Sequence, residues 1–324
     1  MHSASETTTD ALGRLLASRP WLLGDGGMGT GLLARGLPVG TAPERWNLDY
    51  PSRVADLHRE FLDAGADLIL SNSFGGNRRR LALMGEARIE AIDTLAARIA
   101  VETRDACSSH AVVAGSMGPT GALLAPLGPL AVADAEAMFA EQAQALAAGD
   151  VDCLWIETMA SVEEMRAAVA GAATTGLPLV CTFSFDSRGH TMMGVDAAAA
   201  ARAIRELPVR PQLVGANCGD GALEALAVID ALHRELGDDY PLVAKANCGQ
   251  PQYIDGEIHY GHPPALMAEY ARLARDAGAR VVGGCCGTTA AHLIAMRDAL
   301  QAHRPRPFDA DAARAALTGA SAAG

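Results

Sequence analysis

The segment 149–184, GDVDCLWIETMASVEEMRAAVAGAATTGLPLVCTFS, contains the pattern that decides the fold. An apolar run at 153–157 is followed by a segment with helical spacing at 162–173 and by a second apolar run at 179–184. Short apolar runs without polar alternation are typical of strands that are buried on both faces, as in parallel sheets. The segment therefore predicts a strand–helix–strand unit.

The same unit recurs along the whole chain. Further strands are expected at 21–25, 67–72, 111–116, 212–217, 242–247 and 280–284. Further helices are expected at 54–64, 88–106, 135–148, 223–235, 264–277 and 290–300. Eight strand–helix units without a second domain favour a closed (β/α)8 TIM barrel over an open, doubly wound sheet. We expect an N-terminal extension at 1–18, the barrel at 19–304, and a short C-terminal tail at 305–324.

Composition excludes several classes of protein. The 324 residues are half hydrophobic, which excludes intrinsic disorder, and the formal net charge is −12. An acidic chain with 4% aromatic residues is a poor ligand for nucleic acids and for anionic membranes. The uncharged stretches 110–133 and 167–185 are broken by Gly and Pro, so neither predicts a membrane span. No secretory signal is recognisable, and we expect a cytoplasmic protein whose oligomeric state stays open.

The seven cysteines are the most informative residues. Their odd number and the absence of an export signal predict reduced thiols. Cys218 ends the sixth expected strand, and Cys285 and Cys286 follow the eighth. Because barrel strands converge at their carboxyl ends, these three thiols are expected to meet, and three thiolates with one open position are typical of catalytic zinc. The alternatives are an incidental pair or a vicinal disulfide. The remaining cysteines within elements are expected to pack in the core: Cys107, Cys153 and Cys181.

Charged residues also lie at the strand ends. Asp25 and Glu157 end the first and fourth expected strands, where they could form an acid/base pair or bind a substrate ammonium. The glycine-rich segment 24–30 could hold a small carboxylate through its backbone N–H groups. Lys245, in the seventh expected strand, offers a rival function, a Schiff-base lyase. A third hypothesis is a structural zinc or redox-sensing module.

Six motifs give the chain a specific resemblance. They are GDGGMGT at 24–30, PERWN at 43–47, SNSF at 71–74, WIET at 155–158, GANC at 215–218 and GGCCGTT at 283–289. With these motifs the chain resembles, from about residue 20 to 302, the homocysteine S-methyltransferase family. This family includes betaine–homocysteine methyltransferase and the homocysteine module of cobalamin-dependent methionine synthase.

The resemblance implies a zinc-dependent homocysteine S-methyltransferase. In such an enzyme a methyl group is transferred to the zinc-bound homocysteine thiolate, and the product is methionine. The residues that it implies are the catalytic zinc ligands Cys218, Cys285 and Cys286, the ammonium-binding Asp25 and Glu157, and, for the carboxylate, Ser71 and the backbone of Gly26, Gly27 and Met28.

The methyl donor is left open by the sequence. Phe74 is followed by Gly75, where animal betaine enzymes are expected to have Tyr, and Trp46 is a candidate wall of an aromatic cage for an onium donor. No corrinoid or folate domain is expected. The donor is therefore expected to be betaine, a related onium compound such as S-methylmethionine, or a methylated corrinoid or folate on a separate protein. Cys248 is expected to pack near the site, with a spare zinc ligand as the alternative.

Overall fold

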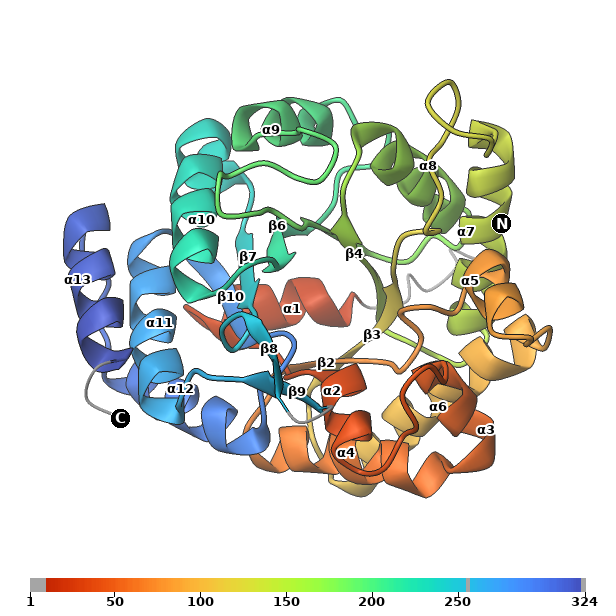
Figure 1. Ribbon diagram of the computed structural model, residues 1–324, viewed down its shortest axis with the longest axis horizontal. Helices are drawn as coiled ribbons and strands as arrows, with labels where there is room; N and C mark the ends of the chain where they lie inside the picture. Colours follow the sequence, from red (N-terminus) through yellow and green to blue (C-terminus); the bar gives the residue numbers. More distant parts are fainter. Residues whose placement is uncertain (1–9, 255–256, 322–324) are drawn as a thin grey trace, which may run out of the picture.

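The computed structural model describes residues 10–254 and 257–321 and is a (β/α)8 barrel (Figure 1). Eight parallel strands follow the order β1-β10-β7-β6-β5-β4-β3-β2. These strands are β1 (Leu22–Leu23), β2 (Leu68–Leu70), β3 (Val112–Met117), β4 (Cys153–Met159), β5 (Leu179–Phe183), β6 (Leu213–Cys218), β7 (Leu242–Ala246) and β10 (Ala279–Gly284). A parallel bridge between Gly24 and Leu68 joins the two ends of the sheet. The predicted TIM barrel is confirmed, and each predicted apolar run overlaps one of its strands.

One helix of the outer ring follows each barrel strand. These helices are α4 (Pro51–Asp63), α6 (Ile89–Ala106), α7 (Val132–Ala147), α8 (Val162–Ala173), α9 (Ala197–Arg205), α10 (Ala222–Leu236), α11 (Pro264–Asp276) and α12 (Ala290–Ala302). Only α9 was not predicted. Its sequence AAAAARAIR is short and mostly alanine, with Ile204 as its one large apolar residue, and Asp196 caps it by accepting a hydrogen bond from the backbone N–H of Ala199.

Helix α1 (Ala11–Ser18) closes the amino-terminal end of the barrel (Figure 1). Leu12 is fully buried and packs in a cluster with side chains that point into the barrel, Trp155 among them. The Arg280 guanidinium at the start of β10 donates to the backbone oxygen of Leu16. The predicted extension 1–18 thus includes a helix that plugs the barrel, and residues 1–9 lie outside the described residues. A cavity in this barrel can open only toward the carboxyl ends of the strands.

Two features that the sequence did not predict lie at the carboxyl end of the barrel. Strands β8 (Pro251–Ile254) and β9 (Glu257–Tyr260) form an antiparallel hairpin after β7, and it crosses the mouth (Figure 1). Three short helices lie in the loops that follow β1 and β2, namely α2 (Met28–Leu33), α3 (Trp46–Asp49) and α5 (Arg78–Leu83). Residues of α2, α5 and β9 line the wall of the barrel mouth.

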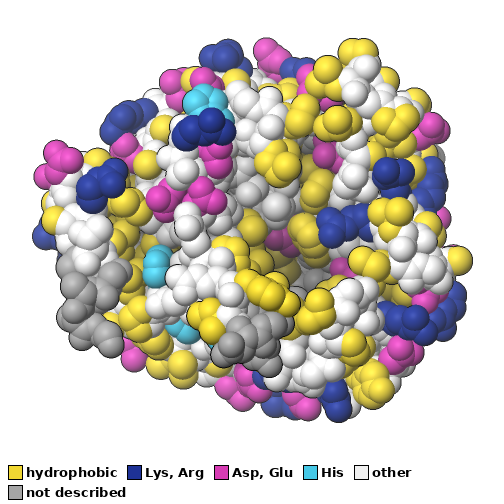
Figure 2. Space-filling view, in the orientation of Figure 1, with side chains coloured by type: hydrophobic (Ala, Val, Ile, Leu, Met, Phe, Trp, Pro, Cys, Tyr) yellow, Lys and Arg dark blue, Asp and Glu magenta, His cyan; other side chains and the backbone are white. Residues whose placement is uncertain are grey.

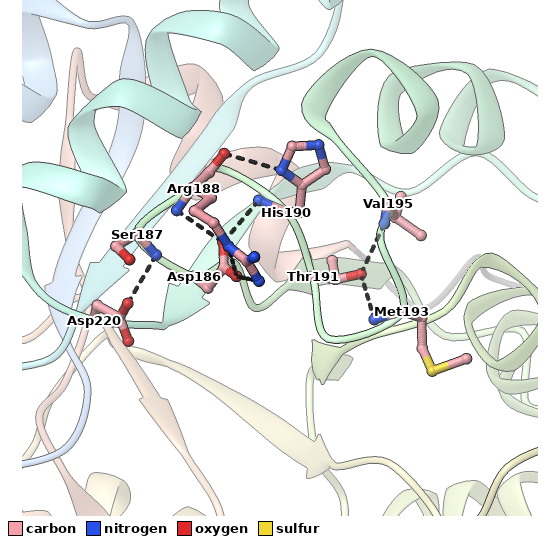
Figure 3. A network of polar contacts seen from close by, with 8 residues as sticks. All are labelled: Asp186, Ser187, Arg188, His190, Thr191, Met193, Val195 and Asp220. Carbon is pink, nitrogen blue, oxygen red and sulfur yellow. Dashed lines mark hydrogen bonds and ion pairs between the residues drawn. The ribbon is translucent and has the colours of Figure 1, made fainter.

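The loop 184–196 between β5 and α9 is held by side-chain-to-backbone hydrogen bonds (Figure 3). The Asp186 carboxylate accepts from the backbone N–H groups of Arg188 and His190. The Ser187 N–H donates to Asp220 Oδ2 at 2.7 Å, which ties this loop to the turn that follows β6. This turn begins directly after Cys218, the last residue of β6, so the loop supports the place where the chain leaves the sheet.

The C-terminal tail predicted at 305–324 forms helix α13 (Ala310–Ser321) on the outside of the ring. Ala313 and Leu317 are buried, and α13 packs against α10 and α11. Residues 322–324 lie outside the described residues. Among the described residues, no helix is both long and apolar enough to cross a membrane.

A buried histidine in α4 is expected to make the stability of the fold sensitive to acid. His58 in α4 is fully buried and neither ring nitrogen has a hydrogen-bond partner, and burial lowers its pKa to about 4. In the unfolded chain this histidine binds a proton at about pH 6.5, whereas in the folded chain it does so at about pH 4. The free energy of unfolding is therefore highest above pH 6.5, and it decreases as the pH falls from 6.5 toward 4. We expect His58→Leu to remove a loss of about 1.4 kcal/mol per pH unit in this window, measured by urea unfolding. The same substitution at the exposed His110 is the matched control for the loss of an imidazole.

Candidate active site

A cavity of about 430 Å³ opens at the carboxyl end of the barrel. Figure 2 shows this end as a hollow with hydrophobic side chains gathered around it. The polar residues that line the cavity include Asp25, Ser71, Ser116, Glu157, Lys245, Cys285 and Cys286. Most of the side chains that the sequence singled out at different strand ends therefore share one cavity, and Cys218, which is not part of its lining, lies next to Cys285 and Cys286.

The thiols of Cys218, Cys285 and Cys286 lie together, with all three sulfur atoms within 4.8 Å of one another. Cys218 is the last residue of β6 and has a left-handed backbone with φ +64°, whereas Cys285 and Cys286 follow β10. A non-glycine residue with this φ is uncommon and is often found at functional sites. Zn–S bonds are about 2.3 Å long, so three sulfurs this close suit one shared metal ion.

All three thiols hold their protons tightly in the absence of a cation. The hydrogen bond from Cys285 lowers the pKa of Cys218, but the one to Cys286 and burial outweigh it and raise that pKa to about 11. The hydrogen bond with Cys218 lowers the pKa of Cys286, but the contact with Cys285 and burial raise it to about 12. The pKa of Cys285 is raised by its hydrogen bond with Cys218 and by burial. A bound cation is what would turn this cluster into thiolates at neutral pH.

Asn247, directly after β7, joins the two turns that carry the thiols. Its Oδ1 accepts from the backbone N–H of Cys286 at 3.0 Å, and its Nδ2 donates to the backbone oxygen of Gly219 at 2.6 Å. The backbone N–H of Cys285 donates to the oxygen of Ala246 at 2.8 Å. The end of β7 thus fixes the spacing between Cys218 and the Cys285–Cys286 pair. The sequence placed Asn247 at the end of an expected strand but gave it no role, because an Asn there has no pattern that points to the partners of its side chain.

The other cysteines lie apart from this cluster. The Cys248 thiol is buried and donates to the backbone oxygen of His262 at 2.9 Å, so it packs beside the site and does not belong to the metal-sized group. Cys153 and Cys181 are fully buried, and Cys107 packs against the core at the end of α6. The packing predicted for Cys107, Cys153 and Cys181 is confirmed.

Both predicted carboxylates are buried and hydrogen-bonded. Asp25 Oδ2 accepts from the backbone N–H of Leu70 at 2.7 Å, and Oδ1 accepts from Lys245 Nζ. Glu157 accepts from Ser116 Oγ at 2.5 Å and from Asn217 Nδ2 at 3.0 Å. Burial raises the pKa of both carboxyls, and the charge of Lys245 opposes that rise. These carboxylates are fixed anionic groups in the inner part of the cavity, where Lys245 also lies, and we call this part the cavity floor.

Lys245 is a buried cation. Burial lowers its pKa, but the charges of Asp25 and Glu157 outweigh burial and leave the pKa raised. Its Nζ also lies 5.5 Å from the centroid of the Trp155 ring, on which a cation is favourable. A Schiff-base nucleophile must be an unprotonated amine. The surroundings of Lys245 therefore do not favour the lyase hypothesis.

The predicted carboxylate-binding groups are partly engaged within the protein. The Gly27 N–H donates to the backbone oxygen of Thr288 at 3.0 Å. Ser71 Oγ accepts from the Ser116 N–H and lies 2.6 Å from Ser73 Oγ, whose own proton goes to the Ser116 oxygen. The Ser71 proton therefore points to Ser73. Gly26 and Met28 line the cavity, as predicted.

The outer part of the cavity is mostly aliphatic. It is lined by residues that include Leu33, Leu37, Val39, Met84 and Ile258. The aromatic residue among the described residues of the lining is Phe74, and the Arg80 guanidinium lies 5.0 Å from its ring centroid. The prediction that Trp46 is a cavity wall was wrong, because Trp46 is buried against Tyr50, 5.1 Å between ring centroids, and beneath Arg53.

Comparison with known proteins gives a consistent result. The family described as Homocysteine S-methyltransferase matches residues 22–300. The chain is 30% identical over 289 residues to a methionine synthase of Mycobacterium tuberculosis, with 84% of this chain and 24% of that protein covered. It is 28% identical over 299 residues to an S-methylmethionine–homocysteine S-methyltransferase of Rattus norvegicus, with 87% and 79% covered.

A solved structure supports the same relationship. The metallated form of the homocysteine methyltransferase MmuM from Escherichia coli aligns with a TM-score of 0.74 and 25% identity, covering 89% of this chain and 99% of that one. The chain spans about a quarter of the length of the methionine synthases that it matches. With a family match over residues 22–300, the chain belongs to the homocysteine S-methyltransferase family.

Proposed function

We propose that this protein is a zinc-dependent homocysteine S-methyltransferase that forms methionine. The observation that carries the proposal is a group of three thiols, two of which share the cavity floor with two buried carboxylates and a lysine. Such a floor combines ligands for a soft cation with groups that bind an amino acid. Family membership and the relatives' names point to the same acceptor.

Cys218, Cys285 and Cys286 are the residues that would hold zinc. Thiolates select soft cations, and three protein ligands with one open position distinguish a catalytic zinc site from a structural one, which has four. When bound, zinc supplies the positive charge that keeps a coordinated thiol deprotonated at neutral pH. Among the described residues no fourth cysteine or histidine joins the group. This argues against a purely structural zinc module.

The charged floor would hold the amino-acid end of homocysteine. We assign the ammonium to Asp25 and Glu157, whose carboxylates are held in place by Leu70, Ser116 and Asn217. Fixing that end directs the sulfur of the substrate toward the cysteine cluster. The sulfur then attacks the methyl carbon as the bond from that carbon to the donor's leaving atom breaks. Holding both reactants in line is a large part of the rate gain in a bimolecular transfer.

The aliphatic outer cavity supports a small onium donor. A sulfonium or quaternary ammonium carries an activated methyl group, and its apolar surroundings fit walls such as Leu33 and Ile258. The rat relatives are named for S-methylmethionine and betaine, and these compounds are the donors to try first. A methylated corrinoid or folate on a separate protein is the alternative outcome of the test below.

A donor screen tests the function. Zinc-loaded protein is incubated with homocysteine and, in separate reactions, betaine, dimethylsulfoniopropionate, S-methylmethionine, methyltetrahydrofolate and methylcobalamin, and methionine is quantified. We expect methionine with at least one sulfonium or ammonium donor. Methionine only with methylcobalamin or methyltetrahydrofolate would reassign the donor, and none with any donor would refute the proposed reaction.

Asn247→Ala is expected to weaken zinc binding without unfolding the barrel. The substitution removes the link between Gly219 and Cys286 that spaces the thiols. Loss of a residue that hydrogen-bonds to the metal-binding residues and orients them typically lowers metal affinity 10- to 100-fold. We expect a loss of roughly this size, measured by competition with a chelator. The control Asn77→Ala removes another fully buried Asn, which caps α5, and should leave zinc affinity unchanged. Equal zinc affinity in both variants would contradict the role of Asn247.

A further inference from the structure

Lys245 is the only lysine in the sequence. The chain has 26 basic residues, and the other 25 are arginines. This one lysine is 3% exposed, lies within β7 and lines the cavity together with Asp25 and Cys285. The other 25 Lys/Arg positions are all arginine, and the one lysine lies at the cavity floor. Its compact ammonium differs from a planar guanidinium in shape and in hydrogen-bond geometry.

The hydrogen bonds of Lys245 leave donors free for a ligand. An ammonium has three N–H groups, and one of them donates to Asp25 Oδ1. The Trp155 ring, 5.5 Å away, offers a face and not an acceptor. Because Lys245 lines the cavity and one donor is used by Asp25, we take the other two donors to be within reach of a ligand in the cavity.

A substrate carboxylate at the cavity floor needs hydrogen-bond donors. Two of the groups predicted to bind it already donate to other parts of the protein. The N–H of Gly27 is used by Thr288, and the hydroxyl proton of Ser71 points to Ser73. Two cations are found among the described residues that line the cavity, Lys245 and Arg80, and Arg80 stacks on Phe74. Lys245 is therefore the charged donor next to the carboxylates that would take the substrate ammonium.

We propose that Lys245 binds the α-carboxylate of the thiol substrate, so that the Asp25–Lys245 pair matches the two opposite charges of an α-amino acid. This inference rests on the proposed function and names its specificity-determining residue. Asp25 and Glu157 take the ammonium, Lys245 takes the carboxylate, and the pair stays neutral when the zwitterion enters. A thiol with only one of the two charges leaves part of this floor unmatched, which the site would reject.

The test compares homocysteine with 3-aminopropane-1-thiol, which lacks only the carboxylate. Affinity for the zinc-loaded protein is measured by calorimetry in the wild type and in Lys245→Met. A hydrogen bond to a charged group contributes about 1.5–3 kcal/mol, so homocysteine affinity should fall roughly 10- to 150-fold. The affinity for 3-aminopropane-1-thiol should change less than about 3-fold. Lys245→Gln, which keeps a neutral donor for Asp25, replaces Lys245→Met if the latter does not fold.

A spectroscopic signature follows from there being one lysine. Lysine-specific ¹⁵N labelling gives a single side-chain amine signal, which should shift with homocysteine and not with 3-aminopropane-1-thiol. An equal loss of affinity for both thiols, or no shift with homocysteine, would overturn the assignment to the carboxylate. If the wild type binds neither thiol and forms no methionine, the proposed function fails; if it does both and only the discrimination is missing, this inference fails alone.

Discussion

The Cys285→Ser protein is expected to contain almost no zinc and to have lost its methyltransferase activity, while it remains folded. A serine hydroxyl is not deprotonated under conditions where a cysteine bound to a metal is, so one ligand of three disappears. The loss of activity should exceed the roughly 10- to 100-fold that is typical when a group behind the ligands is removed. Metal content by elemental analysis and methionine formation are the measurements.

The fold should survive because the backbone bonds at this position do not involve the thiol. The Cys285 N–H donates to Ala246, and the Cys285 oxygen accepts from Thr288. We expect the free energy of unfolding of the metal-free protein to change by no more than about 1 kcal/mol. Cys107→Ser, at the end of α6, is the matched control and should keep both zinc and activity. Full activity in a metal-free Cys285→Ser protein would rule out the zinc proposal.

Glu157→Gln is expected to raise the homocysteine KM by roughly 30- to 5,000-fold. In the proposed complex the negative charge of Glu157 pairs with the substrate ammonium, and the substitution removes that charge. Removing one partner of a buried, hydrogen-bonded charge pair costs about 2–5 kcal/mol of binding free energy, which corresponds to this range of KM. The amide keeps the shape of the side chain, and it can still bond to Ser116 and Asn217, which are the present partners of Glu157.

A second thiol compound shows whether Glu157→Gln weakens binding of the ammonium alone or damages the whole site. 4-Mercaptobutyrate has the sulfur and the carboxylate of homocysteine but no ammonium, so Glu157→Gln should change its affinity by less than about 3-fold. The control Glu164→Gln alters another buried glutamate, which bonds to Thr120, and should leave the homocysteine KM unchanged. If 4-mercaptobutyrate lost affinity in step with homocysteine, Glu157 would have a structural role only.

The barrel was predictable because its signals are local. Each strand is a short apolar run, and most helices have a clear apolar period, so eight units could be counted from the sequence. Helix α9 was missed because it is short and has one large apolar residue, and the β8–β9 hairpin was missed because its first strand is exposed and not an apolar run. Helix α1 looked like an extension, since a sequence does not show that a helix packs across the ends of strands far along the chain.

The candidate site was predictable where chemistry is tied to a strand end. Cys218, Cys285 and Cys286 were expected to meet, and the structure brings them together. What could not be read from the sequence is the pairing between side chains. The Asp25–Lys245 ion pair joins residues 220 positions apart, and the use of the Ser71 proton by Ser73 depends on the geometry of two neighbouring strands, β2 and β3. Pairings of this kind decide which groups remain free for a substrate.

The helix that plugs the barrel has a kinetic consequence. With α1 filling the amino-terminal end, the cavity that the described residues form opens toward the carboxyl ends of the strands, and Ile258 of the β8–β9 hairpin lies in its wall. For the proposed reaction, the amino acid that occupies the floor has to arrive before the methyl donor and has to depart after the spent donor. Turnover would then be a last-in, first-out sequence, in which a donor that arrives early blocks the passage of its own co-substrate.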